Sequence, residues 1–368
     1  MEERAFIDWT PPFTPMQSVS TSPSYTAVRT WGKGIGVLRN TGELGAAQLW
    51  TFRKGKWHAI SEASEKIASG LYGYGAPAWA PFGAHRALGL VPARGVIQMY
   101  DDQGHAIRSF PVEGHQQGYP VRWSKHEFAY VADFGPNVGR AVIVVDIELG
   151  FSRTVWRTAD FLGGLAVDLH SGRVAWHSWP SGTMPWDRAQ VWIADRTYTH
   201  LRPELVAGST GHAAMNPTWI RGQLYFQLEK DEHFRPARQS ESGLQMAAVL
   251  GGESLSDWFF GWPWTVGVGT STAHVTVRSS TTFVHLWRKD GSVELIESSP
   301  VGLQEVAGDD QCLWATGSDH VRGSNLWQYQ LKKQRWRCIS PSSETFLPPD
   351  EVSVSELRRT DSGVPFVY

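Results

Sequence analysis

The sequence has little cysteine, no long apolar run and almost no excess charge, and each of these shortages excludes a class of protein. Two cysteines in 368 residues, Cys312 and Cys338, cannot form the disulfide framework of a small secreted domain. No apolar run approaches the roughly 18 residues that a membrane-spanning helix needs. The formal net charge of −2 argues against a surface that binds nucleic acid or anionic lipid. We therefore expect neither nucleic-acid nor membrane partners.

Two further absences concern targeting and metals. The amino terminus, residues 1–5, is rich in acidic side chains and has no apolar segment of signal-peptide length, so we expect a cytoplasmic protein. The 13 histidines include no His-Glu-Xaa-Xaa-His motif and no close group of cysteine and histidine. The sequence therefore predicts no metal site, and we expect no cofactor.

What is abundant is glycine, proline and tryptophan, at 37, 21 and 19 residues, which suits a β protein with many turns and aromatic packing. A hydrophobic strand also recurs along the chain. The repeated strands are centred on Trp50, Ile97, Val144, Trp192, Trp287 and Trp327. The steps between them are 47, 47, 48, 95 and 40 residues. Because the fourth step is about twice the others, we expect a degenerate copy near Ala237–Arg238.

A second short strand precedes each repeated strand, so each unit holds at least one antiparallel pair. These upstream strands contain residues 36–38, 86–91, 128–131, 173–176, 223–226, 273–277 and 312–315. A period in the 40s without helical patterning is typical of propeller blades. Seven units predict an all-β fold, a seven-bladed β-propeller of four-stranded antiparallel blades. We place the propeller at residues 1–340, with a lead-in segment at 1–24, and a C-terminal tail at 341–368.

Residues 173–187, Arg-Val-Ala-Trp-His-Ser-Trp-Pro-Ser-Gly-Thr-Met-Pro-Trp-Asp, run into a Val-Trp-Ile strand at 191–193. This segment resembles the propeller of prolyl-oligopeptidase-family serine peptidases, most closely the acylaminoacyl-peptidase branch, in which a Met-Pro-Trp-Asp loop joins two such strands. Other similar segments follow the family's order, at residues 6–15, 71–79, 216–226 and 342–356. The resemblance covers nearly the whole chain and only the propeller half of the family.

The resemblance implies that the family's catalytic Ser, Asp and His belong to a separate C-terminal α/β-hydrolase domain, whereas this sequence ends at Tyr368. Residues 269–273, Gly-Thr-Ser-Thr-Ala, are one residue away from a Gly-Xaa-Ser-Xaa-Gly motif. That motif needs a strand-turn-helix context, and residues 274–277 instead continue as a strand. We therefore do not expect Ser271 to act as a nucleophile or this chain to be a serine hydrolase by itself.

The run of residues 258–264, Trp-Phe-Phe-Gly-Trp-Pro-Trp, holds too many large rings for a solvated loop. These rings either pack between blades or face the central cavity and form an apolar ligand wall with other aromatic residues. The candidate ligand-binding residues are Tyr72, Tyr74, Trp79, Trp179, Trp186, Asp187, Trp258, Phe260 and Trp262. His177 is the candidate for acid–base catalysis, with a buried, hydrogen-bonded histidine as the alternative.

These observations leave several functions open. The leading expectation is a non-hydrolytic binding module, a stand-alone peptidase-type propeller that holds a peptide or apolar small molecule or docks a separate hydrolase chain. The alternative is a repurposed enzyme, a cyclase, isomerase or lyase of a biosynthetic pathway that uses the aromatic-lined cavity. A third possibility is that the sequence is a fragment of a longer peptidase.

Overall fold

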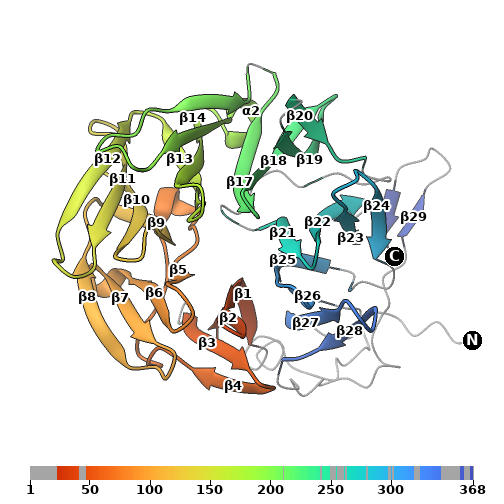
Figure 1. Cartoon of the computed structure of the whole chain (residues 1–368), viewed down its shortest axis with the longest axis horizontal. Coiled ribbons are helices and arrows are strands. Elements are labelled where there is room, and N and C mark those ends of the chain that lie inside the picture. Colours follow the sequence, from red (N-terminus) through yellow and green to blue (C-terminus); the bar gives the residue numbers. More distant parts are fainter. Residues whose placement is uncertain are drawn as a thin grey trace, which may run out of the picture.

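The computed structural model describes residues 23–40, 47–209, 211–240, 243–248, 254, 261, 263–278, 281–296, 300, 302–318, 324–340, 357–359 and 365–367. In this part of the chain, seven four-stranded sheets are arranged around a central opening (Figure 1). Each sheet contains four consecutive strands in antiparallel order. The predicted fold class, a seven-bladed β-propeller of four-stranded antiparallel blades, is confirmed.

The first three blades follow one another from the N-terminal side of the described chain. Blade 1 contains β1 (Ser24–Trp31), β2 (Gly34–Asn40), β3 (Ala47–Arg53) and β4 (Lys56–Ala59). Blade 2 contains β5 (Trp79–Pro81), β6 (Arg86–Val91), β7 (Val96–Asp101) and β8 (Ala106–Pro111). Blade 3 contains β9 (Gln116–Arg122), β10 (Glu127–Asp133), β11 (Arg140–Asp146) and β12 (Ser152–Thr158).

The remaining four blades complete the ring. Blade 4 contains β13 (Phe161–Val167), β14 (Arg173–Trp179), β15 (Gln190–Asp195) and β16 (Glu204–Ala207). Blade 5 contains β17 (Ala214–Ile220), β18 (Gln223–Lys230), β19 (His233–Ser240) and β20 (Gly243–Met246). Blade 6 contains β21 (Thr265–Val268), β22 (Ser271–Arg278), β23 (Thr281–Trp287) and β24 (Val293–Ile296). Blade 7 contains β25 (Gly302–Gly308), β26 (Cys312–Ser318), β27 (Asn325–Gln330) and β28 (Arg335–Cys338).

The other elements are small. β29 (Leu357–Arg359) and β30 (Pro365–Val367) pair with each other as a separate two-stranded sheet. The short helical turns are η2 (Leu71–Gly73), η3 (Pro92–Arg94) and α2 (Pro185–Arg188). None of the helices in the described residues has the length and apolar character that crossing a membrane requires.

The sequence repeat corresponds to the third strand of each blade, and the degenerate copy near Ala237–Arg238 is β19. The predicted upstream strands are the second strands. Both strands lie in the middle of a blade and are covered by the blades on either side, as in β10 and β11, where nearly every residue is buried. Outer strands such as β4 and β8 are mostly exposed. The middle strands therefore carry the hydrophobic runs that make the repeat visible.

The antiparallel order of the strands gives the ring two distinct faces. The first strand of each blade lines the central opening, and the chain then proceeds outward to the fourth strand (Figure 1). The turns between first and second strands therefore all lie on one face, which we call the hairpin face. The connections between successive blades lie on the opposite face, which we call the connection face.

Five of the innermost strands shift register against the second strand of their blade, and in four of them a residue with positive φ lies at the shift. In β1, β9, β13 and β17 the pairing with the second strand shifts register. A residue with positive φ lies at each shift: Ala27, Tyr119, Gly164 and Asn216. A bulge withdraws a backbone N–H from the sheet ladder, so that N–H must find a partner elsewhere. Tyr119 donates its N–H to the carbonyl of Pro77, which directly precedes blade 2, at 2.9 Å.

Blades 1 and 7 close the ring through side chains rather than through a shared sheet. Glu305 of β25, 2% exposed, accepts hydrogen bonds from the N–H groups of Ala27 (2.8 Å) and Val28 (3.1 Å) at the β1 bulge. The guanidinium of Arg29 lies 3.6 Å from the same carboxylate. Burial raises the pKa of Glu305, and Arg29 and the two amide donors oppose that rise. Apolar side chains of both blades form one buried cluster around this contact.

Candidate ligand site in the central channel

The channel contains a cavity of about 600 Å³. The first strands of all seven blades contribute to its wall. Representative lining residues, one from each blade in order, are Thr30, Trp79, Tyr119, Leu165, Asn216, Val266 and Val306. This volume falls within the range of about 300–1,000 Å³ that small-molecule and cofactor sites occupy.

Gly261 borders the cavity from the connection between blades 5 and 6. Its carbonyl accepts a hydrogen bond from Arg29 Nη2 at 3.2 Å. A Cβ at Gly261 would lie 2.3 Å from Pro77 Cγ and 2.9 Å from Tyr119 Cε1, and its φ is +77°. Only glycine fits this position. Pro77 precedes blade 2 and Tyr119 is in blade 3, so Gly261 itself lies against blades on the other side of the channel.

Proline shapes much of the remaining wall. The prolines that line the cavity are Pro77, Pro81, Pro120, Pro217 and Pro263. A first strand has a free edge toward the channel, and proline is tolerated on such an edge because it has no N–H to leave unpaired. Two amide side chains add polar groups, and Asn216 Nδ2 donates to Gln227 Oε1 at 3.1 Å. The wall is thus largely apolar, with a few polar groups at defined positions.

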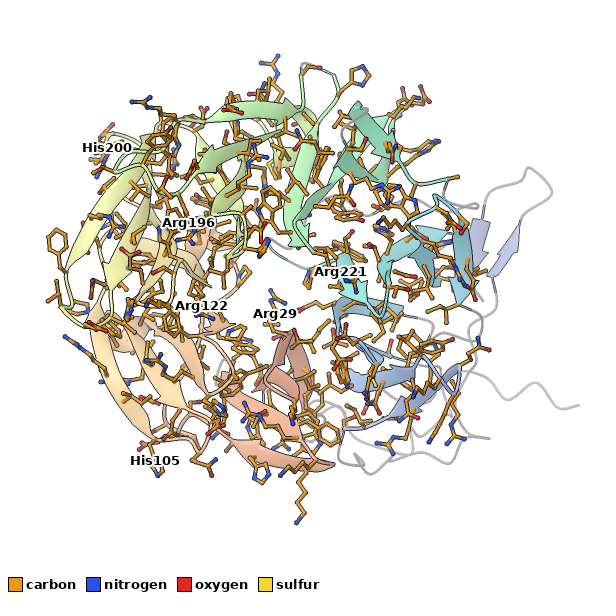
Figure 2. The ribbon with its side chains drawn as sticks, viewed as in Figure 1. Arg29, His105, Arg122, Arg196, His200 and Arg221 are labelled. Carbon is orange, nitrogen blue, oxygen red and sulfur yellow. The ribbon has the colours of Figure 1, made fainter. Side chains whose placement is uncertain are left out.

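The charged side chains that line the cavity are both arginines, Arg29 and Arg122. Arg29, 23% exposed, donates to the Val28 carbonyl at 2.8 Å and to Gly261 in addition to its contact with Glu305. Figure 2 shows Arg29 extending from β1 into the central opening. None of the described lining residues is acidic.

Arg122 ends β9 and is half-buried. Its Nε donates to the Ser124 carbonyl at 3.1 Å, and its guanidinium carbon lies 5.5 Å from the centre of the Phe82 ring. These two contacts restrict the plane of the guanidinium. Arg122 forms no ion pair with any residue in the described part of the chain.

A second hollow, of about 240 Å³, lies on the hairpin face between blades 5, 6 and 7. Its charged lining residues are Arg221, Asp309 and Asp310. Arg221 donates to the carbonyl oxygens of Ser271 (3.3 Å) and Gly269, so its guanidinium is bound to backbone at the rim of the opening (Figure 2). This rim therefore contains both signs of charge, in contrast to the cavity wall.

His177 lies on β14 and is fully buried. Its Nδ1 accepts a hydrogen bond from the Asn216 N–H at 3.3 Å, which assigns the ring proton of the neutral imidazole to Nε2. Burial lowers the pKa of His177 to about 3. A Cβ at Gly163 would lie 2.7 Å from His177 Nε2, so the glycines of β13 leave room for the ring. His177 thus serves as a buried acceptor that joins blade 4 to the β17 bulge.

The structure brings three of the sequence-predicted residues together. The Trp179 ring stacks on His177 at 5.3 Å between centroids and meets the Tyr72 ring edge-on at 5.9 Å. Phe161 completes this cluster, 4.8 Å from Tyr72 and 5.4 Å from Trp179. Tyr72 Oη donates to the Leu162 carbonyl at 3.0 Å, and burial raises its pKa. Trp179 is 3% exposed, so the cluster fills space between blades on the connection face.

The other candidates occupy different surroundings. Trp79 borders the cavity and donates from Nε1 to the Ala27 carbonyl at 2.7 Å. Tyr74 is 58% exposed. Trp186 is half-buried on α2, and the exposed Asp187 accepts a hydrogen bond from the Met184 N–H at 3.0 Å. Trp258, Phe260 and Trp262 lie outside the described residues, although their neighbours Gly261 and Pro263 line the cavity.

Sequence reasoning missed Arg29 and Arg122. Each is a charged residue at or near the C-terminal end of a first strand, close to a bulge that a proline or a small residue introduces. A positively charged side chain near the end of a first strand was the available signal. It becomes informative only when the seven first strands are known to enclose one cavity.

The remaining sequence motifs have simple structural settings. Ser271 begins β22 directly after the turn from β21, so its context is strand-turn-strand. Cys312 and Cys338 are free thiols, the first buried and the second half-buried. Among the described residues, no group of three or more His, Cys, Asp or Glu side chains is placed to hold a metal ion.

The fold and the channel define a seven-bladed β-propeller with a central cavity. Neither a protein-family model nor a curated protein matches the sequence. Similar solved structures include puromycin hydrolase, with a TM-score of 0.85, 15% identity, and 98% of this chain covered. A Mycobacterium tuberculosis puromycin-hydrolyzing peptidase has a TM-score of 0.85 and 15% identity over 97% of the chain. Pyrococcus horikoshii acylaminoacyl peptidase has a TM-score of 0.64 and 11% identity over 92%.

These neighbours are peptidases of the prolyl-oligopeptidase family. The resemblance predicted from the sequence is thereby confirmed in the fold. The chain spans 60% of the length of the two puromycin-hydrolysing enzymes and 55% of the acylaminoacyl peptidase. At these identities the similarity establishes the architecture alone.

Proposed function

We propose that this propeller is a binding module that holds a peptide or an apolar small molecule in its central cavity. The observation that carries the proposal is the cavity of about 600 Å³, bounded across the channel by Gly261 and lined by the first strands of all seven blades. Ligand sites are typically concave and mostly apolar, with a small number of polar groups that orient the ligand.

The composition of the wall supports this reading. Large rings border the cavity, among them Trp79, Tyr119, Trp219 and Trp264. Aromatic side chains offer apolar surface to a ligand. Backbone bonding of an extended peptide to the first strands is limited by Pro81, Pro120 and Pro217, which lie on those strands and lack an N–H. Side chains of the wall are therefore expected to supply most of the contacts.

A cavity-blocking variant tests the proposal. Thr218 lies on β17 and lines the cavity, so Thr218→Trp would fill part of it. The matched control is Thr154→Trp on β12, the outer strand of blade 3. Calorimetric titration of short N-acylated aromatic peptides and of small aromatic compounds should give binding to the wild type and the control and much weaker binding to Thr218→Trp. Equal binding to all three proteins would place the ligand elsewhere, and no binding to the wild type would refute the proposal.

A second candidate function is the docking of a separate hydrolase chain on the connection face. Its support is that the matched peptidases continue well beyond the propeller, since this chain spans 60% of the puromycin-hydrolysing enzymes. Co-expression with the nearest encoded α/β-hydrolase, followed by native mass spectrometry, should give a one-to-one complex. Tyr74→Glu on the connection face should weaken the complex, and Lys125→Glu on the hairpin face should not. A chain that stays free throughout would contradict docking.

The enzyme alternative has weaker support. It assigned acid–base catalysis to His177, but this imidazole is fully buried and its Nδ1 already accepts a hydrogen bond. Its pKa of about 3 leaves the ring neutral near pH 7, and a general base needs access to its substrate as well as the right protonation state.

A further inference from the structure

We propose that the ligand held in the cavity carries a carboxylate, and that Arg122 binds it. This inference rests on the proposed function, because it names the chemical class of ligand for the same cavity. The first observation is that the charged side chains of the cavity wall are two arginines, Arg29 and Arg122.

The two arginines differ in how far their charge is compensated. Arg29 lies 3.6 Å from Glu305, whose two oxygens also accept the N–H groups of Ala27 and Val28. The positive charge of Arg29 is thus partly balanced by Glu305 at the contact between blades 1 and 7. Arg122 forms no ion pair with any described residue. The uncompensated positive charge of the wall is therefore at Arg122.

The hydrogen bonds of Arg122 leave its forked end available. Nε donates to the Ser124 carbonyl, and no described residue accepts a hydrogen bond from Nη1 or Nη2. The four N–H bonds on these two nitrogens lie in one plane and match the two oxygens of a carboxylate. Phe82, 5.5 Å from the guanidinium carbon, helps to hold that plane. The group is thus positioned before a ligand arrives.

The surroundings strengthen such a contact. Water screens a half-buried guanidinium beside apolar and proline side chains less than one on an open surface. The electrostatic attraction between this guanidinium and a bound anion is therefore stronger. Arg122 ends β9 toward the hairpin face, whereas Gly261 and Tyr119 bound the cavity on the opposite side. A bound molecule would therefore point its carboxylate toward the hairpin face and its apolar body toward Tyr119.

Paired acids and amides test this assignment. The probes are benzoyl-glycyl-phenylalanine and its C-terminal amide, together with 3-phenylpropionate and 3-phenylpropionamide. Calorimetric titration of the full chain should show that an acid binds about tenfold or more tightly than its amide, which corresponds to one charge-assisted hydrogen-bonded contact. High salt should reduce this preference. Preference in the peptide pair identifies a peptide C-terminus, and preference in the phenylpropionate pair identifies a small aromatic acid; either result supports the inference.

Variants then locate the contact. Arg122→Gln should abolish the acid preference while amide binding stays unchanged, and Arg122→Lys should retain part of it because the charge remains without the fork. Lys125→Gln, which removes the same charge from the same turn, should leave the preference intact. Melting temperatures establish that each variant is folded, and the salt dependence of the wild type provides a test that needs no variant.

The outcomes separate the two proposals. Equal affinity of acid and amide for the wild type, or an acid preference that survives in Arg122→Gln, would overturn the carboxylate assignment and leave the cavity proposal standing. Absence of binding by all four probes, together with the peptide and compound set used with Thr218→Trp, would overturn the cavity proposal itself.

Discussion

The middle strands of the blades and the first strands around the channel are built by different rules. In β10 and β11 almost every side chain is buried against a neighbouring blade, and the strands are nearly continuous apolar runs. In β9 and β17 a bulge, a proline and polar residues interrupt the pattern. The middle strands stabilise the blades, whereas the first strands join blades together and shape the cavity.

The comparison also shows where polar groups are placed. The bulges of the first strands release backbone N–H groups, and the preceding side of the ring accepts them: through Glu305, the Pro77 carbonyl and His177 Nδ1. Buried polar groups of this kind are costly when they lose a partner. The contacts between blades near the channel should therefore respond to charge and pH, and the blade interiors should respond mainly to volume.

The largest expected effect of a substitution comes from the blade interior. Trp179→Ala removes a ring that is 3% exposed and stacked on His177 and Phe161. We expect a loss of about 3–5 kcal/mol in the free energy of unfolding, the usual cost of deleting a buried large aromatic side chain. Denaturant unfolding measures it. A loss below about 1 kcal/mol, accompanied by weaker ligand binding, would instead show that Trp179 belongs to a ligand wall.

A smaller loss is expected where the ring closes. Glu305→Gln preserves the shape of the side chain but replaces a carboxylate oxygen with an N–H donor that faces a backbone N–H of β1. We expect a loss of about 1.5–3 kcal/mol, the range for a hydrogen bond that involves a charged group. The control is Glu294→Gln on β24, whose exposed carboxylate contacts Arg288 and should matter little. Similar losses for the two variants would show that the contact between blades 1 and 7 is no more sensitive to the loss of a carboxylate than the protein surface.

Acid should weaken the contacts between blades through His177. Its folded-state pKa is about 3, below the usual histidine value of 6.5, so between these values the unfolded chain binds a proton that the folded protein does not. The full free energy of unfolding associated with neutral His177 is present above about pH 6.5, and it decreases as the pH falls toward 3. The expected contribution is about 1.4 kcal/mol per pH unit within that window.

His274, which bonds to Thr265 Oγ1 at 3.0 Å and also has a pKa of about 3, should contribute in the same direction. Unfolding free energies measured across this window, for the wild type and for His177→Gln, give the comparison. The variant keeps a hydrogen-bond acceptor and should show a shallower pH dependence. An unchanged slope would mean that His177 is protonated in the folded state or reaches solvent.

The smallest effect on stability is expected at the channel wall. Thr218 is partly exposed to the cavity, so Thr218→Ala should change the free energy of unfolding by no more than about 0.5 kcal/mol. Denaturant unfolding beside Trp179→Ala tests the contrast directly. A loss above about 1.5 kcal/mol would show that the wall is as tightly packed as the blade interiors.

Much of the fold could be read from the sequence because the blade interiors repeat. Middle strands that are covered on both sides must be apolar, and they recur at the length of one blade, so Trp50, Trp192 and Trp287 mark equivalent third strands. Even the degenerate copy at Ala237–Arg238 was found by its spacing and is β19. The Met-Pro-Trp-Asp loop was also interpretable, because Asp187 accepts a turn hydrogen bond within the same short segment.

The candidate site was predicted less well, and the reason is geometric. Aromatic residues were selected because large rings suit a ligand wall, but Trp179 and Tyr72 fill space between blades while Trp79 borders the cavity. The residues that flank an aromatic ring in the sequence do not distinguish a ring that packs between blades from one that faces the channel. Trp258, Phe260 and Trp262 remain predictions outside the described residues.

The sequence by itself determined the number of blades and their apolar interiors, because these depend on patterns within about 50 consecutive residues. Only the tertiary structure decided which side chains face one another across the ring. Arg29, Arg122 and Gly261 are far apart in the sequence and meet at one cavity because the seven blades close into a circle. Closure is a property of the whole chain, and no local pattern of residues encodes which of them will share its centre.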